Sequence, residues 1–225
     1  MNTRVFLITA KTNLHVGNES GDEFTIIDKA IQRDPLTDLP CINSSSLKGA
    51  INEFCAHSLK MEPIKLQKIF GSDKTEQQKG AQKGEAIFFD AKLLYLPQQD
   101  DDSLYHYATT KNVVEMMKSR VQLFEKQFDF VSQNVLNGKK VEIISDKEFS
   151  DIASNDNLPI IARNCLENGE SKNLWYEQVL PSETILYAII REEGDDLAEL
   201  DGKVVQIGAN ATIGYGYCKF ELINK

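Results

Sequence analysis

Asp28 is the residue of this chain whose setting most readily suggests catalysis. It lies in the segment 24–29, FTIIDK, which follows a polar, glycine-containing stretch. A carboxylate in such a setting can bind a divalent metal ion, or orient a ribose 2′-hydroxyl for attack on the adjoining phosphate. From the residues alone, an aspartate beside Lys29 is more typical of a solvated surface charge, and Asp22 and Glu23 are interpreted in the same way.

A second group of polar side chains suits phosphate binding. Residues 34–49, DPLTDLPCINSSSLKG, form a turn-rich stretch that ends in three serines and a lysine at the start of an amphipathic segment. This pattern predicts a helix N-terminus, where hydroxyls and free backbone N–H groups attract anions. Ser44, Ser45, Ser46 and Lys48 are therefore candidates for phosphate contacts. The plainer alternative is an N-cap followed by a solvated helix lysine.

Glycines recur near the other end of the chain. Residues 206–220, QIGANATIGYGYCKF, place Gly208, Gly214 and Gly216 among small residues, ahead of an expected strand. Glycine allows the backbone to approach a ligand closely and to present its N–H groups to an anion. This glycine loop is the second candidate for backbone contacts with a ligand, and the alternative is a simple hairpin turn.

The spacing of apolar residues predicts the elements that position these segments. The predicted elements are strands at 3–10, 86–96, 183–191, 203–207 and 215–223, and helices at 45–59 and 111–131. Their order suits an α+β fold, with a ferredoxin-like sheet, helices on one face and several insertions. With 225 residues, 41% of them hydrophobic, the chain can bury a sizeable core, so we interpret residues 1–225 as one domain.

Residues 71–84, GSDKTEQQKGAQKG, are predicted to form a mobile loop, because they carry almost no large apolar side chains. The four cysteines lack C-x-x-C spacing, which argues against a zinc site and favours reduced thiols in a cytoplasm. No signal peptide fits the first residues, and no apolar run approaches the roughly 20 residues that a membrane helix needs. We therefore expect a cytoplasmic protein.

The net charge of −9 opposes nucleic-acid binding, because affinity for a polyanion comes largely from lysine and arginine. Much of the acidic excess lies in two runs, at 100–102 and 191–196, which are typical of solvated loops. A groove that contains Arg33 and Lys48 would thus still suit a polyanion. We expect the isolated chain to bind RNA weakly.

Short motifs occur along the chain in the order LHVG at 14–17, IDKAIQRDP at 27–35, SSSLKG at 44–49, FG at 70–71, FDA at 89–91 and the glycine loop. In this combination the chain resembles the RAMP superfamily, which comprises RNA-binding subunits of CRISPR-Cas effector complexes. A narrower resemblance is to the repeated backbone subunit of type III-B (Cmr) complexes, itself close to the type III-A subunit. That resemblance rests on GEAIFFDA at 84–91, NLWYE at 173–177 and LPSET at 180–184.

The resemblance implies an RNA-recognition-like core with a projecting thumb hairpin, which we expect between residues 140 and 175. It implies that Asp28 is the aspartate with which such subunits cut target RNA, using a divalent metal that we take to be magnesium. The implied partners are a guide RNA, a complementary target RNA, copies of the chain placed head to tail and other subunits of a type III complex. The implied RNA contacts are His15, Arg33, Ser44, Ser45, Ser46, Lys48, Gly208, Asn210, Thr212, Gly214, Tyr215 and Gly216.

Several alternatives stay open at this level. Arg33 could instead pair with Asp34 or Asp28, and His15 could be structural. A binding-only scaffold with a silent site would share every motif. A guide-processing endoribonuclease of the same superfamily is disfavoured, because no histidine–tyrosine pair stands out as an acid–base couple. Tyr215 stands where a basic residue is usual in the family, so it would stack on a base in place of a phosphate contact.

Overall fold

The central strand of the sheet, β1 (Asn2–Ala10), pairs with two strands from the far end of the chain. It runs antiparallel to β10 (Ile185–Glu192) on one side and to β12 (Tyr217–Leu222) on the other. From Arg4 to Ala10 every side chain of β1 is buried, so both of its faces are covered. This explains why the sequence of β1 is a nearly continuous apolar run with no polar alternation.

The computed structural model describes residues 1–17, 27–72, 82–130 and 134–224. Asp22, Glu23 and most of the loop predicted at 71–84 lie outside the described residues. Within them, the strands follow the order β11-β12-β1-β10-β4-β5-β7-β6, with β2 beside β4 and β3 beside β10. The other strands of this sheet are β2 Cys41–Ile42, β3 Ile87–Phe88, β4 Ala91–Asp100, β5 Leu104–Thr109, β6 Val135–Leu136, β7 Lys139–Ile143 and β11 Val204–Gln206. The helices are α1 Ser44–His57, α2 Pro63–Phe70, α3 Lys111–Gln122 and α4 Asp146–Ile152, with short 3-10 helices η2 Asp196–Leu200 and η3 Ala211–Ile213.

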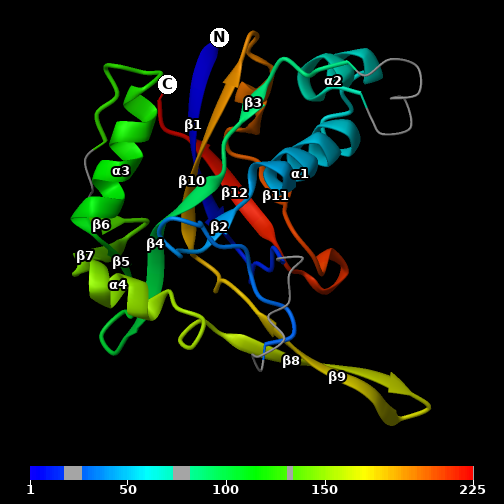
Figure 1. The fold of residues 1–225 in the computed structure, drawn as a ribbon, viewed down its shortest axis with the longest axis vertical. Coiled ribbons are helices and arrows are strands. Elements are labelled where there is room, and N and C mark those ends of the chain that lie inside the picture. Colours follow the sequence, from blue (N-terminus) through cyan, green and yellow to red (C-terminus); the bar gives the residue numbers. More distant parts are fainter. Residues whose placement is uncertain (18–26, 73–81, 131–133, 225) are drawn as a thin grey trace.

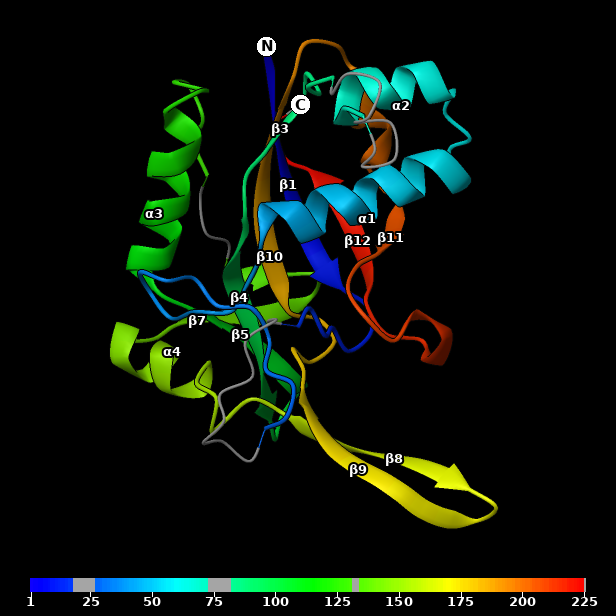
Figure 2. The same cartoon turned by 45° about the vertical axis from the view of Figure 1, so that its right-hand side comes forward.

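Helices cover both faces of the strands at the centre of the sheet. Figures 1 and 2 show α1 and α2 on one side of β1 and β10, and α3 on the other. Helix α1 buries Leu47, Ile51 and Cys55, which are spaced by four residues and so lie along one stripe of the helix. The α+β class is confirmed, whereas the prediction that the helices share one face is wrong. Both faces of β10 are apolar, and each face therefore requires a cover.

A second sheet contains only the hairpin of β8 (Ile160–Glu167) and β9 (Glu170–Gln178), which projects from the body of the molecule (Figures 1 and 2). Its turn is Asn168–Gly169, and both residues have positive φ angles of 53° and 85°. This is the asparagine–glycine pair that a tight two-residue hairpin turn prefers. The hairpin overlaps the range 140–175 in which we expect the thumb, and its role as a thumb stays a prediction.

Several elements differ from those expected from the sequence. Helix α2 and strand β5 were not predicted, and α3 ends at Gln122 and not at residue 131. Strand β5 contains His106, which lies near Asp100 and Glu142 of the neighbouring strands. In the part of the chain that the structure describes, no helix is long and apolar enough to cross a membrane.

Candidate nucleic-acid interface

Asp28 is exposed and is attached to the base of the β8–β9 hairpin. Its Oδ2 accepts a hydrogen bond from the backbone N–H of Tyr176 at 2.7 Å. The next residue, Lys29, adds backbone bonds to the same strand, donating to the Tyr176 carbonyl at 3.1 Å and accepting from Gln178 N–H at 3.0 Å. The second oxygen of Asp28 has no hydrogen-bond partner among the described residues, so it is available to a ligand.

The chemistry of Asp28 fits a magnesium ion held partly by RNA. Magnesium prefers oxygen ligands and is commonly bound by one or two carboxylates together with phosphate oxygens and water. Among the described residues no group of three or more histidine, cysteine, aspartate or glutamate side chains is arranged to hold a metal. The described part of the chain therefore offers the carboxylate of Asp28, and the remaining ligands would come from RNA and water.

Glu177 joins the Asp28 segment to the hairpin and the glycine loop. It is only 1% exposed, and its carboxylate accepts hydrogen bonds from four side chains. The donors are Lys29 Nζ at 3.1 Å, Arg163 Nε at 3.2 Å, Trp175 Nε1 at 2.8 Å and Asn210 Nδ2 at 2.8 Å. Sequence analysis missed Glu177, although it belongs to the NLWYE motif, because two of its partners, Lys29 and Asn210, lie in other segments of the chain.

Burial acts to raise the pKa of Glu177, but the hydrogen bonds from Trp175, Lys29 and Asn210 outweigh burial and lower this pKa from 4.5 to about 2. A carboxyl whose folded pKa is depressed contributes stability above its unfolded pKa and loses that contribution as the pH falls toward the folded pKa. We therefore expect the urea midpoint to fall as the pH is lowered from about 5 to about 2. The urea midpoint of the Glu177→Gln variant should fall less over this pH range. An equal fall in both proteins would contradict the lowered pKa of Glu177.

The glycine loop packs against the segment that follows β1. A Cβ on Gly208 would lie 2.2 Å from the His15 carbonyl oxygen, and one on Gly216 would lie 2.0 Å from the Ile207 carbonyl oxygen. At these two glycines the protein's own backbone approaches closely, which by itself accounts for the lack of a side chain. Gly214 differs, because in the described structure no atom beyond its own chain neighbours lies within 4 Å of its Cβ position. Their contacts with RNA stay predictions.

We expect Gly208→Ala to destabilise the protein much more than Gly214→Ala. The two glycines have φ angles of +81° and +85°, so both variants strain the backbone equally, at about 1–2 kcal/mol. Only the methyl group at position 208 overlaps backbone atoms, which adds roughly 1–3 kcal/mol. Chemical unfolding of the two variants measures this difference directly. Equal losses would mean that the loop is not tightly packed on the His15 segment.

The exposed part of the glycine loop faces away from these contacts. Thr212 and Gly214 are exposed in and after η3, and Asn210 has a left-handed φ of 66°. The guanidinium carbon of Arg163, on β8, lies 4.7 Å from the ring centroid of Tyr215. This cation–π contact joins the hairpin to the loop, so the Tyr215 ring already has a partner in the protein.

The N-terminus of α1 already holds a carboxylate. The helix begins at Ser44, whose backbone N–H donates to Asp90 Oδ1 at 2.8 Å, and no side chain of the N-cap residue caps it. Ser46 Oγ accepts from Gln32 Nε2 at 3.0 Å, whereas Ser45 is exposed. Lys48 is half-buried and has no ion-pair partner among the described residues. Ser45 and Lys48 are thus the members of this group that the structure leaves open to a phosphate.

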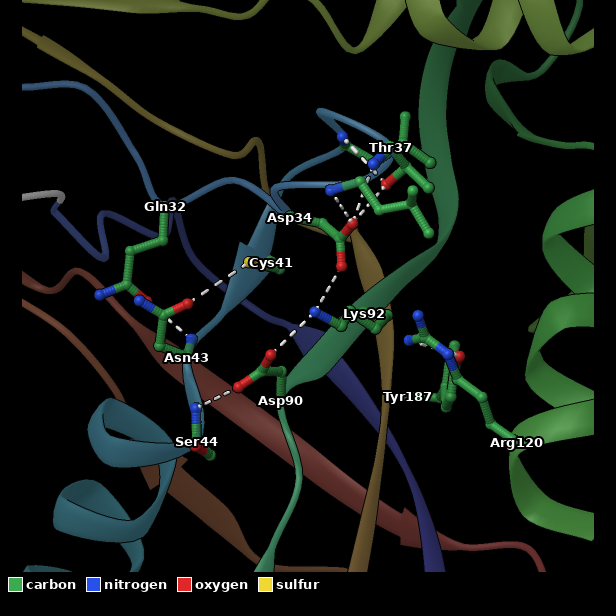
Figure 3. A network of polar contacts seen from close by, with 12 residues as sticks. Gln32, Asp34, Thr37, Cys41, Asn43, Ser44, Asp90, Lys92, Arg120 and Tyr187 are labelled. Carbon is green, nitrogen blue, oxygen red and sulfur yellow. Dashed lines mark hydrogen bonds and ion pairs between the residues drawn. The ribbon is translucent and has the colours of Figure 1, made fainter. Parts of the chain in front are cut away.

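Lys92 connects Asp90 to the turn that precedes α1. Figure 3 shows its ammonium group between two carboxylates, 2.6 Å from Asp34 Oδ2 and 2.9 Å from Asp90 Oδ2. Asp34 also accepts the backbone N–H groups of Leu36 and Thr37, each at 2.9 Å. Burial acts to raise the pKa of Asp34, but the Lys92 and backbone hydrogen bonds outweigh it and lower this pKa from 3.8 to about 2. This cluster fixes the start of α1.

The guanidinium group of Arg33 is hydrogen-bonded within the protein. Its Nε donates to Asn155 Oδ1 at 2.8 Å, and its terminal nitrogens donate to the carbonyls of Asp38 and Ala153. The guanidinium thus joins the 34–40 turn to the end of α4 and pairs with neither Asp34 nor Asp28. Burial lowers the pKa of Arg33. Its contact with a guide RNA stays a prediction, and such a contact would compete with these three bonds.

The side chain of His15 is buried and contacts the backbone of β9. The side chain is 3% exposed, and Nδ1 lies 2.7 Å from the Gln178 carbonyl oxygen at the end of β9. The ring lies under the base of the hairpin, and its contact with RNA stays a prediction. The structure therefore brings together the Asp28 segment, the base of the hairpin and the glycine loop, while the serines and Lys48 belong to a separate cluster at the start of α1.

Comparison with known proteins places the chain in a family. The RAMP superfamily model matches residues 7–219. The "CRISPR system Cmr endoribonuclease Cmr4" of Pyrococcus furiosus is 27% identical over 280 residues, which cover 94% of this chain and 92% of that protein. The "CRISPR system CMR subunit Cmr4" of Saccharolobus solfataricus is 32% identical over 67% of this chain and 51% of its own length.

A similar fold is found in a solved structure, the "Cryo-EM structure of the Type III-B Cmr-beta bound to cognate target RNA". One of its chains matches with a TM-score of 0.75 and 20% identity, covering 99% of this chain and 97% of the other. Because the family model extends over nearly the whole sequence and the fold agrees, the chain belongs to the RAMP superfamily.

Proposed function

We propose that this chain is a backbone subunit of a type III-B CRISPR effector complex, which binds guide RNA and cuts complementary target RNA at Asp28 with a divalent metal ion. The proposal is supported by the names of the two relatives, one of which is called an endoribonuclease. The observation that carries it is the position of Asp28 at the base of the β8–β9 hairpin, where one oxygen of its exposed carboxylate has no hydrogen-bond partner among the described residues.

The chain's own residues would act mainly by holding RNA in place. Ser45 and Lys48 at the start of α1, with the exposed Thr212 and Gly214, would contact phosphates of the guide. Such contacts carry no sequence information, so base pairing with the guide would select the target. A β-hairpin that disturbs the paired RNA would bring one ribose 2′-hydroxyl into line with the adjoining phosphate beside Asp28.

The carboxylate of Asp28 would then orient that hydroxyl or help to hold a magnesium ion at the site. Attack by the 2′-hydroxyl forms an O2′–phosphorus bond, breaks the bond to the 5′-oxygen and leaves a cyclic phosphate and a 5′-hydroxyl. Magnesium, when bound, would stabilise the charge that develops on the phosphate oxygens. The chain's contribution would be the carboxylate and its fixed attachment to the hairpin.

The test is cleavage of an end-labelled RNA complementary to the guide, using complex assembled with this chain, in magnesium or in chelator. We expect evenly spaced products, one per subunit, that appear only with the metal. A target that stays intact but bound would make the chain a scaffold of the same kind of assembly. Cleavage that persists in chelator would contradict the metal requirement.

A further inference from the structure

A groove lined by cationic and aromatic side chains lies between α3 and the strands β4 and β10. It has a volume of about 280 Å³ and is lined by Phe89, Asp90, Lys92, Arg120, Leu123, Phe124, Tyr187 and Ile189. Figure 3 shows Arg120 of α3 beside Tyr187 of β10 and near Lys92. We call this cavity the α3 groove. No role in the proposed function is assigned to it.

Lys92 in the α3 groove is already paired with Asp34 and Asp90, but the guanidinium group of Arg120 is not neutralised within the described part of the chain. Arg120 donates only to the Tyr187 hydroxyl, at 3.4 Å, and has no carboxylate partner among the described residues. Arg191, beside the groove, lies 4.5 Å from the Phe124 ring centroid, and its Nε is buried without a hydrogen-bond partner. In a chain of net charge −9, two unpaired guanidinium groups beside aromatic rings indicate a site for an anionic group.

The groove also has an apolar rim. Leu123, one of its lining residues, is 73% exposed. Exposed aliphatic side chains beside arginine and aromatic rings are typical of a protein interface, where such residues provide most of the binding energy. A phosphate backbone would leave this leucine in water. The groove therefore suits a protein segment that presents both carboxylates and an aliphatic side chain.

The turn between β4 and β5 of this same chain has that composition. Its sequence is Asp101–Asp102–Ser103–Leu104; the two aspartates are exposed without ion-pair partners in the described structure, and Leu104 is 83% exposed. The acidic run at 191–196 already has partners, because Asp195 pairs with Arg4 and Asp196 with Lys65. Among the described residues, the β4–β5 turn is thus an acidic segment whose aspartates are left to bind elsewhere.

The turn cannot reach the groove of its own molecule. Lys92, which lines the groove, and Asp100, which begins the turn, lie at opposite ends of β4. Eight residues of a strand span about 26 Å. The turn and the groove are different surfaces at opposite ends of the strand. Contact between the turn of one copy and the groove of the next is therefore heterologous, and it can repeat from copy to copy.

We propose that the β4–β5 turn of one copy docks in the α3 groove of the next. Asp101 and Asp102 meet Arg120, and Leu104 packs against Leu123 and Phe124. This inference rests on the proposed function, in which copies line up along a guide RNA, and it names the surfaces through which they touch. The repeat between copies would be set by the length of β4.

The proposal is tested by reversing the charge of protein side chains and measuring how the copies assemble on guide RNA. We expect Arg120→Glu to weaken association between copies about tenfold or more, and Asp101→Lys with Asp102→Lys to do the same, because close charge pairs at an interface are strongly coupled. Combining the three changes should restore association to within about threefold of the natural chain. Lys111→Glu, an exposed change on the same helix, is the matched control. Sedimentation velocity of the full chain with guide RNA measures the assembly.

Cysteine cross-linking adds a readout that does not depend on affinity. In a Cys165→Ser background, chains with Leu104→Cys and chains with Leu123→Cys should form disulfide-linked dimers only when mixed. The proposed contact would be overturned if copies line up on guide RNA without cross-linking. It would also be overturned if the triple charge variant does not regain association between copies. Either result would leave the proposed function standing. Failure of the natural chain to bind guide RNA would instead overturn the proposed function.

Discussion

Asp28→Ala is expected to lower the rate of target-RNA cleavage by at least about 100-fold, while guide binding is retained. The change removes the carboxylate that would bind the metal or the 2′-hydroxyl, and it also removes the hydrogen bond from Tyr176 N–H. Cleavage of labelled target under single-turnover conditions gives the rate, and a filter-binding assay gives the guide affinity. Asp156→Ala, at another exposed aspartate, should leave both unchanged.

Asp28→Asn separates the two contributions of this side chain. Asparagine keeps an oxygen that can accept from Tyr176 N–H but loses the negative charge. If the charge is essential, Asp28→Asn should be as inactive as Asp28→Ala. If asparagine restores cleavage, the carboxylate serves only to attach the segment to β9, and the proposed catalytic role is wrong.

Lys92→Ala is expected to cost about 3–5 kcal/mol of unfolding free energy, because it leaves carboxylates uncompensated in a poorly solvated cluster. The side chains of Lys92 and Asp34 are only 15% and 7% exposed. The loss should appear as a lower urea midpoint. Lys140→Ala is the matched control: Lys140 lies 3.1 Å from Glu142 on the surface, and its removal should cost less than about 1 kcal/mol.

A double-mutant cycle shows whether the loss of unfolding free energy comes from the ion pair between Lys92 and Asp34. In an Asp34→Asn background, Lys92→Ala should cost clearly less than in the natural chain, because the partner charge is already absent. Equal costs in both backgrounds would mean that Lys92 stabilises the protein through the packing of its aliphatic stem. The turn before α1 would then owe its shape to the backbone bonds of Asp34 alone.

The elements that the sequence predicted well are those buried along one stripe or on both faces. Helix α1 shows apolar residues at helical spacing, and β1 and β10 are continuous apolar runs. A hairpin between residues 140 and 175 was expected only from the family resemblance, because much of β8–β9 is exposed on both faces and its strands lack polar–apolar alternation. Its one local signal was the Asn168–Gly169 pair, which is typical of a two-residue hairpin turn.

The candidate site could be predicted only in part, for a related reason. Asp28 was found through the family resemblance, since a single carboxylate has no local signature. Glu177 and Lys92 were missed because each has a partner that is distant in sequence: 148 positions separate Lys29 from Glu177. Such pairs form only when the fold brings the segments together. The glycine loop was found, but the sequence did not show that the His15 carbonyl closely approaches Gly208, whose contact with RNA stays a prediction.

The place of β1 between β10 and β12 has a consequence for synthesis. About 175 residues separate the end of β1 from the start of β10, which corresponds to roughly 10–35 s of ribosomal elongation. During that interval β1, which contains the apolar run Val5–Ile8, has neither of its neighbours. Folding must therefore wait for most of the chain, and long-range pairing of this kind is slow. The nascent protein would depend on chaperones to shield β1 from aggregation.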